Sequence, residues 1–272
     1  MEAPEIAEFA VRGDTGLDIF HRVDARSERR YHYECLATVL PEGDSPRLMP
    51  YHPIARRHPE RMFAAARRFG ENPALMQAMA LGDPASYPHP QDARARLEVF
   101  LYLDFLRLWQ VGELEIARMR SNLQTGASVR PADISRLLRL LLDYNQIHAA
   151  AGFIPAMRPH LFQAAQTGRD DKWGNAAYAL RMMGDLYARA GQQAEALAAY
   201  EGAISLGDNA HRRGLAIRAA HAAGNLAALQ EHLTQYESKW SLPDDLAQLN
   251  PAIMPIATKE GSHGTDTTRE LR

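Results

Sequence analysis

The sequence has a single cysteine, Cys35, so a disulfide within the chain and a metal site built from several cysteines are both excluded. It has no apolar run near the roughly 18 residues that a membrane-spanning helix needs. Its first residues, MEAPEIAEFA, lack the basic start and the apolar stretch of a secretion signal. We therefore expect a soluble, cytoplasmic protein that does not act at a membrane.

The chain also lacks an excess of charge of either sign. Its 31 Lys and Arg residues against 33 Asp and Glu residues leave a net charge of −2 over 272 residues. A nucleic-acid partner recognised through bulk positive charge is therefore not expected. Hydrophobic residues make up 46% of the chain, which is ordinary for a globular protein, and the length suffices for a sizeable core.

Motifs that carry chemistry are absent as well. The sequence shows no phosphate-binding glycine loop, no GxSxG turn, no dinucleotide fingerprint and no HExxH pair. His52 with His58, and His211 with His221, lack the spacing of three or four residues that places two ligands on one helical face. We therefore assign no catalytic residue, no metal ligand and no cofactor.

Residues 1–50 differ in composition from the rest, because they are acidic and carry one apolar alternation. That alternation spans residues 31–40 and predicts a strand, which ends at the turn residues 41–44. A lone strand is unstable, so it needs a partner, and residues 47–49 are the candidate. Cys35 lies within the strand and is predicted to be a buried structural thiol.

Residues 51–90 read as short helices followed by a proline-rich connector. Residues 59–69 form one predicted helix, Asn72-Pro73 opens another, and residues 86–90 make the connector. The segment also gathers basic side chains, namely Arg56, Arg57, Arg61, Arg67 and Arg68. They could meet phosphate groups, or they could dock onto the acidic first fifty residues of the same chain, which is the simpler explanation.

Repeated glycines are the most informative feature of the sequence. Each follows one predicted helix and precedes another, at separations of 40, 39 and 33 residues: Gly112, Gly152, Gly191 and Gly224. Glycine suits a tight turn between helices because a helix C-terminus favours a left-handed residue without a Cβ atom. Helical hairpins bury their apolar faces by stacking on neighbouring hairpins, so the spacing predicts an α-solenoid.

Residues 177–210 resemble a tetratricopeptide repeat, a helical hairpin of about 34 residues. Six positions of that family's pattern are filled here by Gly184, Tyr187, Gly191, Ala196, Tyr200 and Ala203. The next unit keeps Gly224 but is degenerate, and the hairpins around Gly112 and Gly152 keep only the turn glycine. The resemblance implies an all-α protein, built as a right-handed α-solenoid of stacked hairpins with a short irregular or α+β N-terminal segment.

Four segments are therefore expected. An acidic segment with possible short strands occupies residues 1–50, and short helices with the connector occupy residues 51–90. The tetratricopeptide-like repeat domain occupies residues 91–240, and a closing segment with a polar tail occupies residues 241–272.

The resemblance also implies protein binding on the concave surface made by the first helix of each hairpin. The side chains that would line this surface are Tyr178, Arg181, Asp185, Arg189, His211, Arg218 and His221. Arginine forks suit carboxylates, so a protein or an acidic peptide segment is the expected partner. Members of the family that clamp a chaperone's C-terminal carboxylate have asparagine where this chain has Asp185, which argues against that clamp. These residues could also be simply solvated helix faces.

Two functional hypotheses follow, beside a third possibility, a regulatory sensor whose solenoid binds a peptide signal. The first is an interaction protein, acting as an adaptor, scaffold or chaperone without enzymatic activity. The second is an enzyme or enzyme-associated protein with its active site in the N-terminal segment and the solenoid as a targeting arm. A pocket with converging polar residues at the junction would favour the second hypothesis. N-terminal helices that merely extend the array would count against it.

Overall fold

The computed structural model describes residues 8–24, 31–42, 45–81, 92–127, 129–147, 154–168, 171 and 174–250. In this part of the chain, four strands form one antiparallel sheet in the order β1-β2-β3-β4. The strands are β1 (Glu8–Arg12), β2 (Leu17–Asp24), β3 (Tyr31–Leu40) and β4 (Arg47–Pro50). The predicted strand at residues 31–40 and its predicted partner at residues 47–49 are therefore confirmed.

A tight turn joins β1 to β2, and the amide of Gly13 donates to the carbonyl of Gly16 at 2.8 Å. Phe9 lies opposite Phe20, and a bulge between Ile19 and Phe20 brings Phe20 opposite Cys35. Cys35 is only 1% exposed, as predicted, and burial raises the pKa of its thiol well above the usual value.

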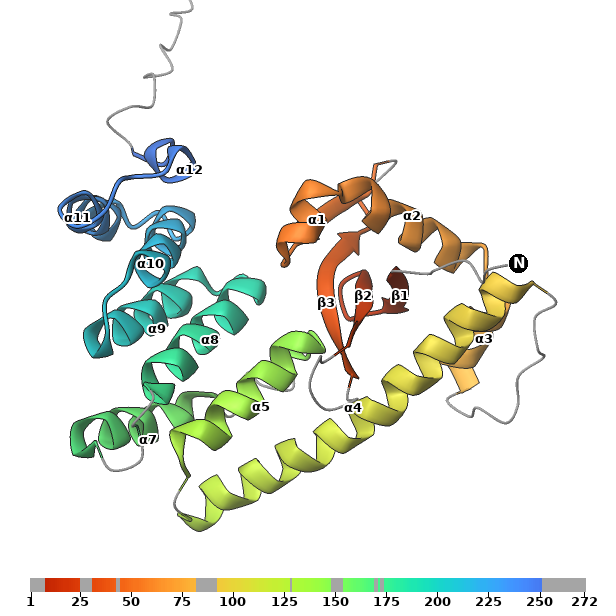
Figure 1. Cartoon of the computed structure of the whole chain (residues 1–272), viewed down its shortest axis with the longest axis horizontal. Coiled ribbons are helices and arrows are strands. Elements are labelled where there is room, and N and C mark those ends of the chain that lie inside the picture. Colours follow the sequence, from red (N-terminus) through yellow and green to blue (C-terminus); the bar gives the residue numbers. More distant parts are fainter. Residues whose placement is uncertain are drawn as a thin grey trace, which may run out of the picture.

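Helices cover both sides of this sheet (Figure 1). They are α1 (Pro53–Arg57), α2 (Pro59–Gly70), α3 (Pro73–Leu81) and the long α4 (Ala93–Thr125). The ring of Phe105 in α4 lies 4.7 Å from that of Phe20 and 5.9 Å from that of Tyr33, between centroids. Met62 and Ala65 of α2 are buried in the same core cluster.

Two basic residues of α2, Arg61 and Arg68, dock onto the N-terminal segment, as the sequence predicts for the basic group. Arg61 forms an ion pair with Glu8, and Arg68 donates to the carbonyl oxygen of Glu8 at 2.9 Å. Arg68 also donates through Nε to Glu98 of α4 at 3.0 Å. The amide of Asn72 donates to the other oxygen of Glu98 at 3.1 Å. This cluster ties the sheet, α2 and α4 together.

The turn predicted at Gly112 is wrong, because α4 runs without a break through that residue. Gly112 is buried against Leu140, and a Cβ atom there would lie 2.9 Å from the nearest methyl group of that side chain. The residue therefore permits close helix packing rather than a turn. The helix ends at Gly126, which has the left-handed φ of 68° that a C-terminal cap favours.

The remaining helices form a curved row that leads away from the sheet (Figure 1). In order they are α5 (Pro131–Asp143), α7 (Ile154–Thr167), α8 (Asn175–Arg189), α9 (Gln193–Leu206), α10 (Ala210–Ala222), α11 (Leu226–Glu237) and α12 (Asp244–Ala247). Gly191 and Gly224 stand at the turns of the α8–α9 and α10–α11 pairs with φ values of 77° and 67°. Both turns are confirmed, whereas the turn predicted at Gly152 lies outside the described residues.

The chain is mostly helical, as predicted, but its class is α+β rather than all-α. The correction comes from β1 and β2: β2 pairs with β3 and β1 pairs with β2, so that the sheet is a structural layer with helices on both sides. Within the described residues, no helix combines the length and the apolar character that crossing a membrane requires.

Candidate functional site

The side chains predicted to bind a partner lie on α8 and α10, the first helices of the two hairpins. Tyr178 is 39% exposed, which is unusual for a large side chain on these helices. The guanidinium carbon of Arg181 lies over its ring, 4.8 Å from the centroid. Such a stacked pair gives a rigid surface with both aromatic and cationic character.

Asp185 fixes the arginine of this pair. It forms an ion pair with Arg181, and it accepts a hydrogen bond from the hydroxyl of Tyr200 on α9 at 2.9 Å. Burial raises the pKa of Asp185, although Arg181 and Tyr200 oppose that shift. Asp185 therefore orients Arg181, whose side chain is only 17% exposed, while the ring of Tyr178 is more open to solvent.

On α10, His211, Arg218 and His221 are all exposed. Partial burial and the positive charge of the nearby Arg181 lower the pKa of His211. His211 therefore lies near the cluster that Tyr178, Arg181 and Asp185 form on α8. Arg218 forms an ion pair with Asp245 of α12, and its charge is therefore already partnered within the chain. Among the described residues, the side chain of His221 forms no hydrogen bond or ion pair with the others. We call Tyr178, Arg181, Asp185, His211 and Arg218 the α8–α10 face.

Arg189, which was also predicted to bind a partner, connects α8 to other parts of the fold. Its guanidinium donates to the carbonyl oxygen of Leu142 at 2.7 Å and stacks over the ring of Tyr51, 4.3 Å from the centroid. It also approaches the side-chain oxygen of Asn145 at 3.5 Å. Arg189 thus joins the end of α8 to the end of α5 and to the segment that follows β4.

Arg189 belongs to a buried polar network, which lies where the sheet meets the helical row. Thr38 of β3 donates to Asp18 of β2 at 2.6 Å, and the hydroxyl of Tyr51 lies 2.9 Å from that of Thr38. Asn145 donates to Thr38 at 3.5 Å and has a left-handed φ of 53°. Asn145 follows the end of α5, where a left-handed asparagine is an ordinary way to close a helix.

Cavities adjoin this network. One of about 280 Å³ is lined by Asp18, Tyr51, Asn145 and Arg189. A larger one, of about 510 Å³, reaches Asp18 and Asn145 from the side of α3 and α4. Polar side chains from four separate parts of the chain therefore converge on a hollow at the junction. A pocket of this kind is the observation that favours the second hypothesis drawn from the sequence, an active site in the N-terminal segment.

Burial raises the pKa of Asp18, while its hydrogen bonds to Thr38 and Asn145 oppose the shift. A carboxyl group whose pKa is higher in the folded state disfavours folding once it ionises. The contribution of Asp18 to the stability of the wild type should therefore fall as pH rises from about 3, below the usual aspartate pKa, to 7, and Asp18→Asn should not share that loss. Asparagine can still accept the bond from Thr38.

Urea unfolding at a series of pH values checks this prediction. The free energy of unfolding of Asp18→Asn, relative to wild type, should rise with pH across this range. A difference that stays constant or falls would mean that the folded protein favours the ionised carboxylate.

Metal binding has no support in the described part of the chain, where no group of three or more His, Cys, Asp or Glu side chains is placed to hold an ion. His21 and His52 do come together, with ring centroids 5.8 Å apart, and His21 lies 3.6 Å from Glu34. Sequence reasoning did not pair them, because they belong to different elements.

The junction network was also missed by sequence reasoning. Its members stand at positions 18, 38, 51, 145 and 189, so no local spacing connects them. Only Arg189 was singled out, and for a different reason. No protein-family model, no curated protein and no solved structure matches this chain.

Proposed function

We propose that this chain is a protein-interaction module, an adaptor, scaffold or chaperone, which binds a protein segment on the α8–α10 face. The observation that carries the proposal is the ordered pair of Tyr178 and Arg181. Its arginine is held by Asp185, and Asp185 is fixed in turn by Tyr200. Tyrosine and arginine dominate the energetics of protein interfaces, and side chains ordered in advance lose less entropy on binding.

A tetratricopeptide-like solenoid is the architecture that we propose for the helical row. In its support, α9 packs against both α8 and α10, and the turn glycines of the two hairpins share a left-handed conformation. Gly184 also packs against the ring of Tyr200, where the family resemblance expects a small residue facing an aromatic one. In such a solenoid, the α8–α10 face would be the concave surface.

The expected partner carries acidic groups. Of the residues on this face, Arg218 is the most accessible to such a partner. Both side chains of the Arg218–Asp245 ion pair are exposed, and exposed pairs stabilise a protein by only about 0–1 kcal/mol. A carboxylate of the partner can replace Asp245 at little cost. Arg181, in contrast, is held more firmly by the half-buried Asp185.

Affinity capture from a lysate of the source cells tests this proposal. The double variant Tyr178→Ala/Arg218→Glu should retain about tenfold less partner protein than the wild type, because it loses an aromatic contact and reverses one charge. Leu226→Ala is the matched control, since Leu226 is 61% exposed but lies on α11. Equal retention by the double variant and the control would rule out the α8–α10 face as the binding site.

The junction cavity supports a second candidate function, a small-ligand or enzymatic site. The specific observation in its favour is the convergence of Asp18, Tyr51, Asn145 and Arg189 on one hollow. The same capture experiment separates the two functions. A wild-type chain that retains no protein at all would turn the search to small ligands for this cavity.

A further inference from the structure

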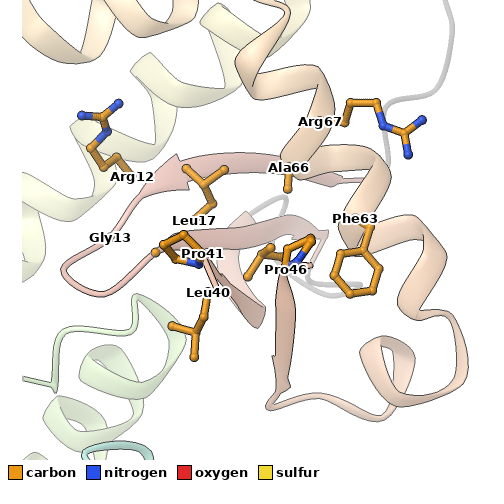
Figure 2. A pocket seen from close by; sticks show the side chains of 11 residues that line it. Arg12, Gly13, Leu17, Leu40, Pro41, Pro46, Phe63, Ala66 and Arg67 are labelled. Atoms are coloured by element: carbon orange, nitrogen blue, oxygen red, sulfur yellow. The ribbon is translucent and has the colours of Figure 1, made fainter. Parts of the chain in front are cut away.

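A separate groove lies on the other side of the sheet from the junction network. It has a volume of about 800 Å³ and is formed by the β1–β2 turn, the end of β3 and one side of α2. Its walls are mainly apolar, with Leu17, Pro41, Pro46 and Phe63 arranged around it in Figure 2. Neither proline has a backbone N–H group, so an occupant gains chiefly from apolar contact there.

Two arginines stand at the ends of this groove. Figure 2 shows Arg12 at one end and Arg67 at the other, with their guanidinium groups directed away from each other. Both side chains are exposed, and among the described residues neither has an acidic partner. By contrast, Arg61 and Arg68 of α2 each form an ion pair with a glutamate.

This placement constrains the occupant. One anionic group cannot reach both guanidinium groups, because the apolar part of the groove lies between them. A simple fatty acid would therefore leave one arginine unpaired. An occupant that satisfies both ends has two anionic groups separated by an apolar stretch, which an extended peptide segment provides.

We propose that this groove binds an extended segment of a partner protein whose apolar side chains are flanked at both ends by Asp or Glu. The site lies apart from the α8–α10 face and does not depend on the function proposed for that face. It would give the chain a second recognition surface, on its N-terminal sheet.

Selection of short random peptides displayed on phage, with the intact chain as target, tests the proposal. We expect enrichment of sequences with an apolar centre and an acidic residue on each side. A selected peptide, labelled for fluorescence anisotropy, should bind Arg12→Glu/Arg67→Glu about tenfold or more weakly than wild type. The same peptide with lysines in place of its acids should prefer that double variant.

Controls separate the groove from other surfaces. Arg56→Glu/Arg57→Glu changes two exposed arginines of α1 outside the groove and should leave peptide binding unchanged. Tyr178→Ala/Arg218→Glu should also leave it unchanged, which keeps a failure here distinct from a failure at the α8–α10 face. Ala66→Trp should block the groove and abolish binding, with circular dichroism confirming that each variant folds.

Three results would overturn the proposal. The first is a selection that enriches no peptide. The second is an enriched peptide that binds wild type, Ala66→Trp and the groove charge variant equally. The third is a groove that binds sodium decanoate but none of the selected peptides, since its occupant would then be an acyl chain.

Discussion

The Arg68→Met variant is expected to lose about 3–5 kcal/mol of the free energy of unfolding, because it leaves a buried carboxylate without its cation. The side chain of Glu98 is only 5% exposed, and Arg68 is the positive partner that the described part of the chain gives it, at 3.0 Å. Asn72 contributes one further hydrogen bond, which does not neutralise the charge. Arg68 also anchors Glu8 of β1, so its loss loosens the sheet from α2 as well.

The neighbouring Arg67 provides the matched control, since it is exposed and has the same side chain on the same helix. Arg67→Met should change the free energy of unfolding by no more than about 0.5 kcal/mol in urea titrations. The double variant Arg68→Met/Glu98→Leu should recover part of the loss, because both charges are then absent. Equal losses for Arg67→Met and Arg68→Met would contradict the buried ion pair.

Gly184→Val is expected to destabilise the chain by about 3 kcal/mol, at the upper end of the range for overpacked cores. A Cβ atom at Gly184 would lie 2.3 Å from the ring of Tyr200, and the methyl groups of valine would make this steric clash worse. The ring cannot turn away freely, because its hydroxyl is bonded to Asp185. Thermal and urea unfolding both measure the effect.

Gly214→Ala on α10 is the control for this substitution. Its added methyl group would meet Arg218 at 3.4 Å and Leu246 at 3.5 Å, which are ordinary contacts. Alanine also favours a helix over glycine by up to about 1 kcal/mol, so this variant should be neutral or more stable. A Gly184→Val variant as stable as Gly214→Ala would show that α8 and α9 do not pack as described.

Local patterns in the sequence predicted the elements that they can specify. The alternation in residues 31–40 predicted β3, and the left-handed turns at Gly191 and Gly224 follow from the glycine pattern. The strands β1 and β2 were missed, although Gly13 and Gly16 bracket a tight turn between them. The strand β2 depends on pairing with β3, and β1 depends on pairing with β2, which a local pattern cannot reveal.

Gly112 shows why a glycine pattern misleads. A glycine that ends a helix and a glycine that admits a neighbouring helix look alike in sequence, and only packing against Leu140 distinguishes them. Arg189 makes the same point for the candidate site. The family resemblance placed it with Arg181, but the fold brings it to Tyr51 and Leu142, which are remote from it in the chain.

The most direct test of binding at the α8–α10 face is site-specific photo-crosslinking in the intact chain. Benzoylphenylalanine in place of Tyr178 keeps an aromatic ring on the face, and the same residue in place of Leu226 probes an even more open position on α11. Irradiation in a lysate of the source cells should attach one protein partner at position 178 and none at position 226. Attachment at both positions alike, or at neither while the chain still retains a protein, would contradict the account.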